Sequence, residues 1–243
     1  MERDQLYADQ DRTPEDGSFV FDDAVARVFP DMLSRSIPGY AASLRAIETL
    51  ARKHVKPNTR CYDLGCSLGA ATLAIAKGSR FDSCRITAVD SAPAMVARCR
   101  EILNATETAV PIDVACADVR DTDIQDASMV AMNYTLQFVP PADRQTVIDR
   151  IGRGLEPGGV FVLSEKVVDE DPAVNELLIE LHHDFKRQHA YSDAEIANKR
   201  TAIENVLVPD TLATHRKRLF DAGFKTVGVW LRHFNFVSMI AVR

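Results

Sequence analysis

The sequence predicts an α/β fold built on a mostly parallel, seven-stranded sheet, and two features of the 243-residue chain support this. From residue 60 onward, short apolar runs alternate with helical patterns, which is typical of parallel strands joined by crossover helices. The last two apolar runs have almost nothing between them, which predicts an antiparallel hairpin that closes the sheet. The chain has no internal repeat or low-complexity linker, so we expect a single domain over 1–243.

The N-terminal part, 1–57, is expected to contain an arm and two helices. The first 20 residues are mostly polar and predict a loose arm. A short helix is predicted over 22–29, capped by Asp22 and stopped near Pro30. An amphipathic helix is predicted over 41–54.

The core sheet is expected within 58–166. Its predicted strands are 60–64, 85–90, 111–116, 128–133 and 159–164, with helices near 69–77, 92–105 and 142–154. The segment 167–223 is too long for an ordinary crossover. Its helical pattern predicts a helical cap over the site, with Leu177, Leu178, Leu181 and Phe185 on one side. The closing hairpin takes up 224–243.

Charge and composition restrict the function. The net charge of −6 argues against direct contact with nucleic acid, which usually needs a basic surface. The charged N-terminus does not resemble a secretory signal, and no apolar run approaches the length of a membrane span. Five cysteines without a CxxC pair indicate reduced thiols and no metal site. We therefore expect a cytoplasmic protein that does not bind membranes.

Polar residues follow three predicted strands in succession. Asp63 ends the first strand and precedes a small-residue turn over 65–69, where glycines let a ligand approach the backbone closely. Asp90 ends the second strand, Asp118 follows the third, and a Pro-Gly-Gly turn at 157–159 enters the fifth. One such carboxylate is more often a helix cap or a surface group. Three in order predict a nucleoside site at the carboxyl ends of the strands.

This pattern resembles the Rossmann-like class I S-adenosylmethionine-dependent methyltransferases more than dinucleotide-dependent dehydrogenases. The turn reads G-C-S-L-G and lacks the G-x-G-x-x-G of a dinucleotide site. The acidic residue after the third strand and the terminal hairpin also fit the methyltransferase sheet. Ser67 stands where many members of that superfamily have glycine.

A closer resemblance covers nearly the whole chain and is to the carboxy-S-adenosyl-L-methionine synthase family. It is carried by VFPDMLSRSIPGY (28–40), YDLGCSLGAATLAIA (62–76), SAPAMVARCR (91–100), ASMVAMNYTLQFVPPADR (127–144), GLEPGGVFVLSEK (154–166), HHDFKRQHAYSDAEIANKR (182–200) and RLFDAGF (218–224). The resemblance implies that S-adenosylmethionine (SAM) and prephenate are converted to carboxy-SAM and phenylpyruvate. It also implies a homodimer, no metal, and a downstream tRNA carboxymethyltransferase that uses the product on wobble uridine.

The resemblance further implies which residues bind SAM. These are Tyr40; Gly65, Cys66 and Ser67 beside the methionyl part; Asp90 and Ser91 at the ribose; Asp118 and Val119 at the adenine; and Asn133 near the sulfonium. Arg200 is the expected catalytic residue. The matching arginine of the family comes from the neighbouring subunit and holds the new carboxylate.

Several side chains keep an alternative interpretation. Arg200 also fits a surface pair with Glu195 or Glu204. His182, Lys186 and His189 share a helix face at i, i+4 and i+7, which fits a solvated basic face or a surface that attracts an anionic substrate.

Arg35, Glu165 and Cys66 also carry groups that suit chemistry in a site. Arg35 is a second possible substrate anchor. Glu165 fits either a base or a carboxylate that caps a helix terminus. Cys66 has no histidine near it in sequence and is not expected to be a nucleophile.

Two rival functions share the predicted SAM site. One is a conventional small-molecule methyltransferase, which would not need Arg200. The other is a non-catalytic SAM-binding module that docks a tRNA enzyme, and it would show no turnover with prephenate.

Overall fold

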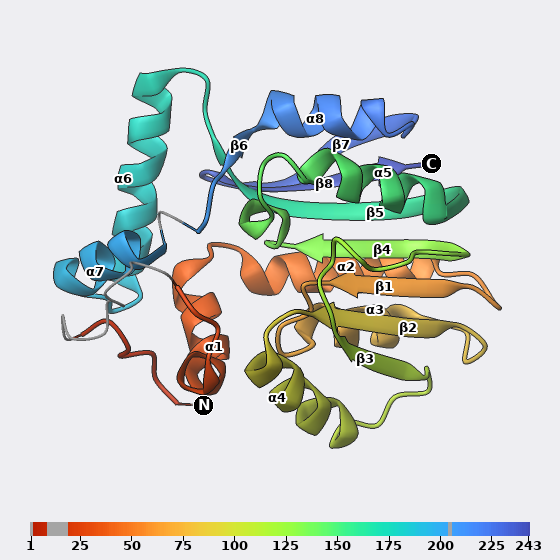
Figure 1. Ribbon diagram of the computed structural model, residues 1–243. Helices are drawn as coiled ribbons and strands as arrows, with labels where there is room; N and C mark the ends of the chain where they lie inside the picture. The colour runs from red at the N-terminus through yellow and green to blue at the C-terminus, as the bar shows by residue number, and fades with distance from the viewer. Residues whose placement is uncertain (1, 9–18, 204–205) are drawn as a thin grey trace.

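The computed structural model describes residues 2–8, 19–203 and 206–243. Helices cover both faces of one twisted sheet, and α1, α6 and α7 lie beyond the carboxyl ends of its parallel strands (Figure 1). The predicted α/β class is therefore confirmed.

The described residues contain eight strands. These are β1 (Arg60–Leu64), β2 (Arg85–Asp90), β3 (Ile112–Cys116), β4 (Ala127–Asn133), β5 (Leu155–Val168), β6 (Asp210–Thr211), β7 (Thr226–His233) and β8 (Phe236–Val242). The sheet order is β3-β2-β1-β4-β5-β8-β7, and the short β6 pairs with the end of β5. Strands β1 to β5 run parallel, whereas β8 is antiparallel to both neighbours. The predicted seven strands are the main path, and β6 is an addition.

The helices connect and cover these strands. They are α1 (Asp23–Ser36), α2 (Tyr40–His54), α3 (Ala70–Gly78), α4 (Pro93–Asn104), the 3-10 turn η2 (Leu136–Phe138), α5 (Arg144–Gly154), α6 (Pro172–Gln188), α7 (Asp193–Ile203) and α8 (Leu212–Asp221). None of the described helices is long and apolar enough to cross a membrane.

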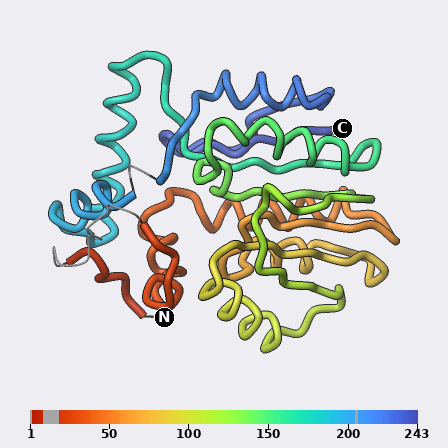
Figure 2. Tube along the Cα trace, in the orientation of Figure 1, coloured from red at the N-terminus to blue at the C-terminus, as the bar shows by residue number. Residues whose placement is uncertain are grey.

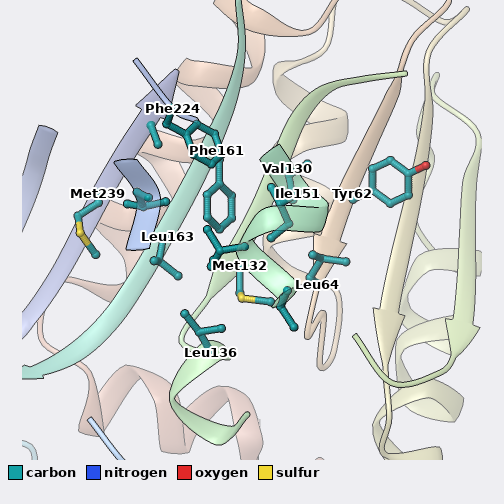
Figure 3. Packing of buried hydrophobic residues seen from close by; sticks show 14 of the residues in the cluster. Tyr62, Leu64, Val130, Met132, Leu136, Ile151, Phe161, Leu163, Phe224 and Met239 are labelled. Carbon is teal, nitrogen blue, oxygen red and sulfur yellow. The ribbon is translucent and has the colours of Figure 1, made fainter. Parts of the chain in front are cut away.

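Two apolar clusters hold the layers together. On one face, α5 and α8 bury side chains such as Ile151 and Leu219 against Phe161 and Met132 of the sheet (Figure 3). On the other face, α2 and α3 pack residues such as Ile47 and Ile75 against β1, β2 and β4. Because both faces are covered, the central strands read as continuous apolar runs.

Two predicted boundaries are wrong. Helix α1 passes through Pro30 and ends at Ser36, because Phe29 and Met32 on either side of the proline are buried and hold the helix in place. Tertiary packing therefore outweighs the local penalty of proline. Strand β5 begins at Leu155, since Leu155 pairs with Ala127 before a register shift accommodates the Pro-Gly-Gly turn.

The described part of the N-terminal arm is not loose. Asp4 is almost fully buried and accepts hydrogen bonds from the Tyr191 hydroxyl and from Lys199 Nζ. Arg35 donates to the backbone oxygen of Asp4, so residues 2–8 lie against α1 and the α6–α7 turn (Figure 2). Residues 9–18 of the predicted arm lie outside the described residues.

Candidate active site

A cavity of about 620 Å³ lies at the carboxyl ends of the parallel strands, as expected for an α/β sheet. Its lining includes every residue that the sequence predicted for the site: Tyr40, Gly65, Cys66, Ser67, Asp90, Ser91, Asp118, Val119, Asn133 and Arg200. The strand ends supply the acidic residues, the start of α2 supplies Tyr40, and α7 supplies Arg200. Residues from opposite ends of the chain therefore meet in one site.

The turn after β1 needs glycine at its first position. Gly65 has a φ of +79°, and an added Cβ would overlap the Thr135 side chain. Ser67 also has a positive φ, +48°, a backbone conformation that glycine adopts more readily than serine. The N–H groups of Gly65 and Cys66 donate to the Val89 oxygen at 2.8 and 2.9 Å, which fixes the turn beside β2.

The Asp90 carboxylate is held by backbone donors. It accepts hydrogen bonds from Ser67 N at 2.8 Å and from Ala92 N at 2.9 Å, and burial raises its pKa. These bonds fix the carboxylate and leave further lone pairs for the hydroxyls of a ribose. Ser91 beside it is exposed.

Asp118 carries a partner that the sequence did not reveal. The Arg120 guanidinium donates to both carboxylate oxygens of Asp118, from Nε to Oδ1 at 3.1 Å and from Nη2 to Oδ2 at 2.7 Å, and its Nη1 donates to Asp143 at 2.8 Å. Hydrogen bonds from Arg120 hold the pKa of Asp118 below its ordinary value. Asp118 is therefore ionised at neutral pH and acts as an acceptor. Val119 beside it is buried.

Asp63 lines the cavity, although the sequence pattern identifies it only as the end of a strand. It is fully buried in the cavity lining, and its Oδ2 accepts a hydrogen bond from Thr72 at 2.6 Å. Burial raises its pKa to about 6. Within the described ranges, Asp63 Oδ1 and Asn133 Oδ1 are buried without a hydrogen-bond partner. Orphaned acceptors in a cavity indicate a ligand that donates hydrogen bonds there.

Glu165 caps the turn η2, in agreement with one of its two interpretations. Its carboxylate is fully buried on β5 and accepts from Leu136 N at 2.9 Å and Gln137 N at 2.8 Å. Burial raises its pKa to about 8. Arg144 holds the same loop from the other side by donating to the oxygens of Val139, at 2.8 Å, and Gln137, at 3.1 Å. The loop after β4, which lines the cavity, is thus fixed by buried polar bonds.

The face of α6 that covers the cavity is basic and largely buried, so a simple solvated basic face is wrong. His182 and Lys186 are buried in the cavity lining, whereas His189 is exposed at the end of the helix. Burial lowers the pKa of His182 to about 2. Its Nε2 lies 2.8 Å from the Ser36 oxygen and carries the proton, since a carbonyl only accepts. The leucines 177 and 181 instead face away and are exposed.

Arg35 is not a substrate anchor. Its guanidinium donates to the backbone oxygens of Asp4, His189 and Ala190 at 2.7–3.0 Å and pairs with Asp31. All three guanidinium nitrogens therefore take part in contacts that fasten the N-terminal segment and α1 to the α6–α7 turn. Arg200 behaves differently, because no ion pair joins it to Glu195 or to any other described residue, while Glu204 lies outside the described residues.

Charge changes sign across the cavity. Asp118, Asp90 and Asp63 lie at the ends of β3, β2 and β1, whereas Lys166 lies at the end of β5, beneath α6 and α7. Lys186 and Arg200 join Lys166 at that basic end. The arrangement fits a nucleoside with a cationic sulfonium over the acidic strands and an anion over the basic ones.

Cys66 lines the cavity but is not an activated thiol. The neighbouring Cys99 thiol and burial raise the pKa of Cys66 well above its ordinary value. Among residues 2–8, 19–203 and 206–243, no group of three or more His, Cys, Asp or Glu side chains has an arrangement that could hold a metal ion.

Comparison with known proteins places this geometry in a family. The chain is 53% identical over 233 residues to "Carboxy-S-adenosyl-L-methionine synthase" of Aliivibrio fischeri (strain MJ11), covering 95% of this chain and 96% of the relative. It is 50% identical over 243 residues to the protein of the same name from Shewanella baltica (strain OS155 / ATCC BAA-1091), covering 100% and 99%. The chain belongs to the carboxy-S-adenosyl-L-methionine synthase family. It is therefore an enzyme.

Other comparisons of this synthase-family chain concern the fold alone. A methyltransferase domain model matches residues 62–159. Human N-acetylserotonin methyltransferase in complex with SAM superposes with a TM-score of 0.61 at 15% identity, covering 100% of this chain and 60% of that one. Magnesium protoporphyrin IX methyltransferase from Synechocystis PCC 6803 gives a TM-score of 0.57 at 15% identity, covering 84% and 80%. These likenesses confirm the class I methyltransferase fold.

The turn at Gly65 gives a first prediction for this synthase-family site. We expect Gly65→Ala to weaken SAM binding at least about tenfold, because the new Cβ overlaps Thr135 and the positive φ is strained. Isothermal titration calorimetry measures the affinity. Gly158→Ala is the control, since its φ of +77° carries the same strain but nothing lies within 4 Å of the new Cβ. Equal loss of affinity in both variants would contradict a steric role for Gly65.

The buried carboxylate on β5 gives a second prediction. Glu165→Gln keeps one acceptor oxygen and turns an NH2 group toward a backbone donor, so we expect unfolding to require about 1–3 kcal/mol less. Urea denaturation measures this change. Glu156→Gln on the same strand is the control, because that side chain is 37% exposed and pairs only with Lys56. If both variants unfold alike, Glu165 does not hold the loop.

Proposed function

We propose that the protein converts SAM and prephenate to carboxy-SAM and phenylpyruvate. The proposal rests on the distribution of charge in the cavity. One end is acidic, and the other end holds Lys166, Lys186 and Arg200, which have no carboxylate partner among the described residues. A methyl transfer to a neutral acceptor has no use for that basic end. A reaction that binds a dianion and creates a carboxylate does. The half-identical synthases support the same choice.

SAM would lie along the strand ends in the order that the resemblance implies. Asp90, fixed by two backbone donors, suits the ribose hydroxyls, and Asp118 with Val119 suits the adenine. The turn 65–67 suits the methionyl part. The orphaned oxygens of Asp63 and Asn133 suit the α-amino group and the positive sulfonium end of the ligand.

The chemistry requires no oxidant or reductant. The bond between the prephenate ring and its ring carboxylate breaks. The electron pair of that bond makes the ring aromatic and expels the hydroxyl group as hydroxide. Phenylpyruvate and carbon dioxide result. The hydroxide takes a proton from the sulfonium methyl and becomes water. The resulting ylide carbon bonds to carbon dioxide and forms the carboxymethyl group, so atoms and charge balance.

Such an ylide survives only where bulk water is excluded. Phe21 and Phe138 form part of an aromatic wall of the cavity, with ring centroids 5.5 Å apart, and Phe19 packs on Phe21 at 4.9 Å. The apolar wall supplies the dry surroundings. Arg200 would hold the new carboxylate, because its guanidinium offers a planar pair of donors.

The proposal extends to the use of the product. Carboxy-SAM would serve a cytoplasmic tRNA carboxymethyltransferase that modifies wobble uridine, as the resemblance implies. The net charge of −6 supports this division of work, because a protein that makes the reagent does not need to grip RNA.

We also propose a homodimer in which Arg200 contributes to the partner's cavity. Helix α6 turns Val174, Leu177 and Leu181 outward at i, i+3 and i+7, with 40%, 53% and 36% of their surfaces exposed. An apolar stripe of this kind suits a self-complementary contact about a two-fold axis. Arg200, on the neighbouring α7, is exposed and lines the cavity of its own chain, so the proposed dimer would have to turn its guanidinium toward the partner's cavity.

The main test is turnover. Incubation with SAM and prephenate should give carboxylated sulfonium and phenylpyruvate by mass spectrometry. Arg200→Ala should retain SAM affinity and lose nearly all carboxylated product, because the carboxylate anchor is gone. Arg187→Ala on the exposed side of α6 is the matched control and should keep wild-type yield. Methylated product, or full yield from Arg200→Ala, would contradict the proposal.

The dimer has its own test. Sedimentation equilibrium should give about twice 26.9 kDa for the wild type and the monomer mass for Leu177→Glu/Leu181→Glu. Co-purified Asp90→Asn and Arg200→Ala subunits should regain part of the activity, since one site of each mixed dimer has both residues intact. A wild-type monomer, or no recovery in the mixed dimer, would refute the shared site.

A further inference from the structure

Two lysines from different elements meet at the basic end of the cavity. Lys166 is near the carboxyl end of strand β5, and Lys186 is on helix α6. Lys186 is only 9% exposed. In the described parts of the chain, no carboxylate pairs with either Nζ, and neither Nζ donates a hydrogen bond.

The neighbouring carboxylate of Asp4 is not a counter-ion for Lys186 or Lys166. Asp4 is the described carboxylate near Lys186, and it already accepts from Lys199 at 3.4 Å and from the Tyr191 hydroxyl. Lys199 thus has a structural partner, whereas Lys186 and Lys166 have none. An ammonium buried without a counter-ion is unfavourable, so this arrangement indicates an anion that arrives with the ligand.

Electrostatics agrees with the geometry. Burial and the nearby charges of Lys199, Lys166 and Arg200 lower the pKa of Lys186 to about 7, and the charge of Asp4 opposes the shift. Burial also lowers the pKa of Lys166. His182 and His183, on the same face of α6, have lowered pKa values and stay neutral near pH 7. A bound carboxylate would restore the full charge of Lys186.

We propose that Lys186 and Lys166 form a subsite for the 2-oxo carboxylate of the substrate, the carboxylate that survives in the product. This inference rests on the proposed function. It assigns an anchor for the dianion, whereas Arg200 holds the new carboxylate of the product, and it predicts that 2-oxo acids with an aromatic side chain bind there without turnover.

The choice between the two carboxylates of prephenate follows from their fates. The ring carboxylate loses its charge as carbon dioxide leaves, so a fixed cation there would stabilise the substrate more than the transition state. The 2-oxo carboxylate keeps its charge throughout. A lysine pair that binds it stabilises substrate and transition state equally, and its loss should raise KM far more than it lowers kcat.

Phenylpyruvate is the probe, because it carries the 2-oxo carboxylate and cannot react. Calorimetry with SAM-loaded wild type, Lys186→Gln and Lys166→Gln should show phenylpyruvate binding at least about tenfold weaker in each variant. The KM for prephenate should rise by a similar factor, and the affinity for SAM should stay unchanged. Lys53→Gln, an exposed lysine on α2, should match wild type in all three.

Lys186→Arg separates binding from structure. In wild type, the affinity for phenylpyruvate should fall as the pH rises through about 7, because Lys186 loses its proton. The permanent charge of arginine should restore the affinity and make it independent of pH in this range. Wild type should take up protons on binding at pH 8, seen as a heat that varies with buffer. Unchanged phenylpyruvate affinity in both glutamine variants, or weakening that Lys186→Arg does not rescue, would overturn the subsite. Lack of product from wild type with prephenate would instead refute the proposed function, while phenylpyruvate binding still decides the subsite.

Discussion

The buried, unpaired charge of Lys186 is the constraint on which the site depends. The protein as a whole is acidic, with a net charge of −6, yet it holds this ammonium and Lys166 in one cavity with no carboxylate partner in the described ranges. An unpaired buried ammonium lowers the stability of the ligand-free protein and favours the binding of an anionic ligand. The opposite end carries Asp63, Asp90 and the Arg120-bound Asp118, so the cavity separates charge along its length.

The fold produces this separation through strand order. Parallel strands end at one edge, and the order β3-β2-β1-β4-β5 lays their terminal residues out as acids first, then an amide, then a lysine. Buried polar bonds keep that edge rigid. Glu165 holds the backbone N–H groups of the loop after β4, and Arg144 holds its carbonyl oxygens. Preorganisation of this kind suits a reaction whose intermediate must not meet water.

The strand ends could be predicted from sequence because each is a local pattern: an apolar run, a carboxylate and a turn. Contacts between segments that are distant in the sequence could not be predicted in this way. Asp4 is buried against Tyr191 and Lys199, which lie some 190 positions away in the sequence. The orientation of α6 could not be predicted either, because the pattern places its leucines on one side without showing that His182 and Lys186 face the cavity and Leu177 faces outward. A helix with apolar and basic faces does not reveal which of them covers a ligand.

The central claim is that this cavity places a dianion beside the sulfonium methyl and captures the carbon dioxide released there. Single turnover with prephenate labelled with ¹³C in its ring carboxylate, in unlabelled bicarbonate buffer, tests it most directly. The account predicts that mass spectrometry finds the label in the carboxymethyl group of nearly every product molecule. An unlabelled carboxylate, drawn from the buffer, would contradict it.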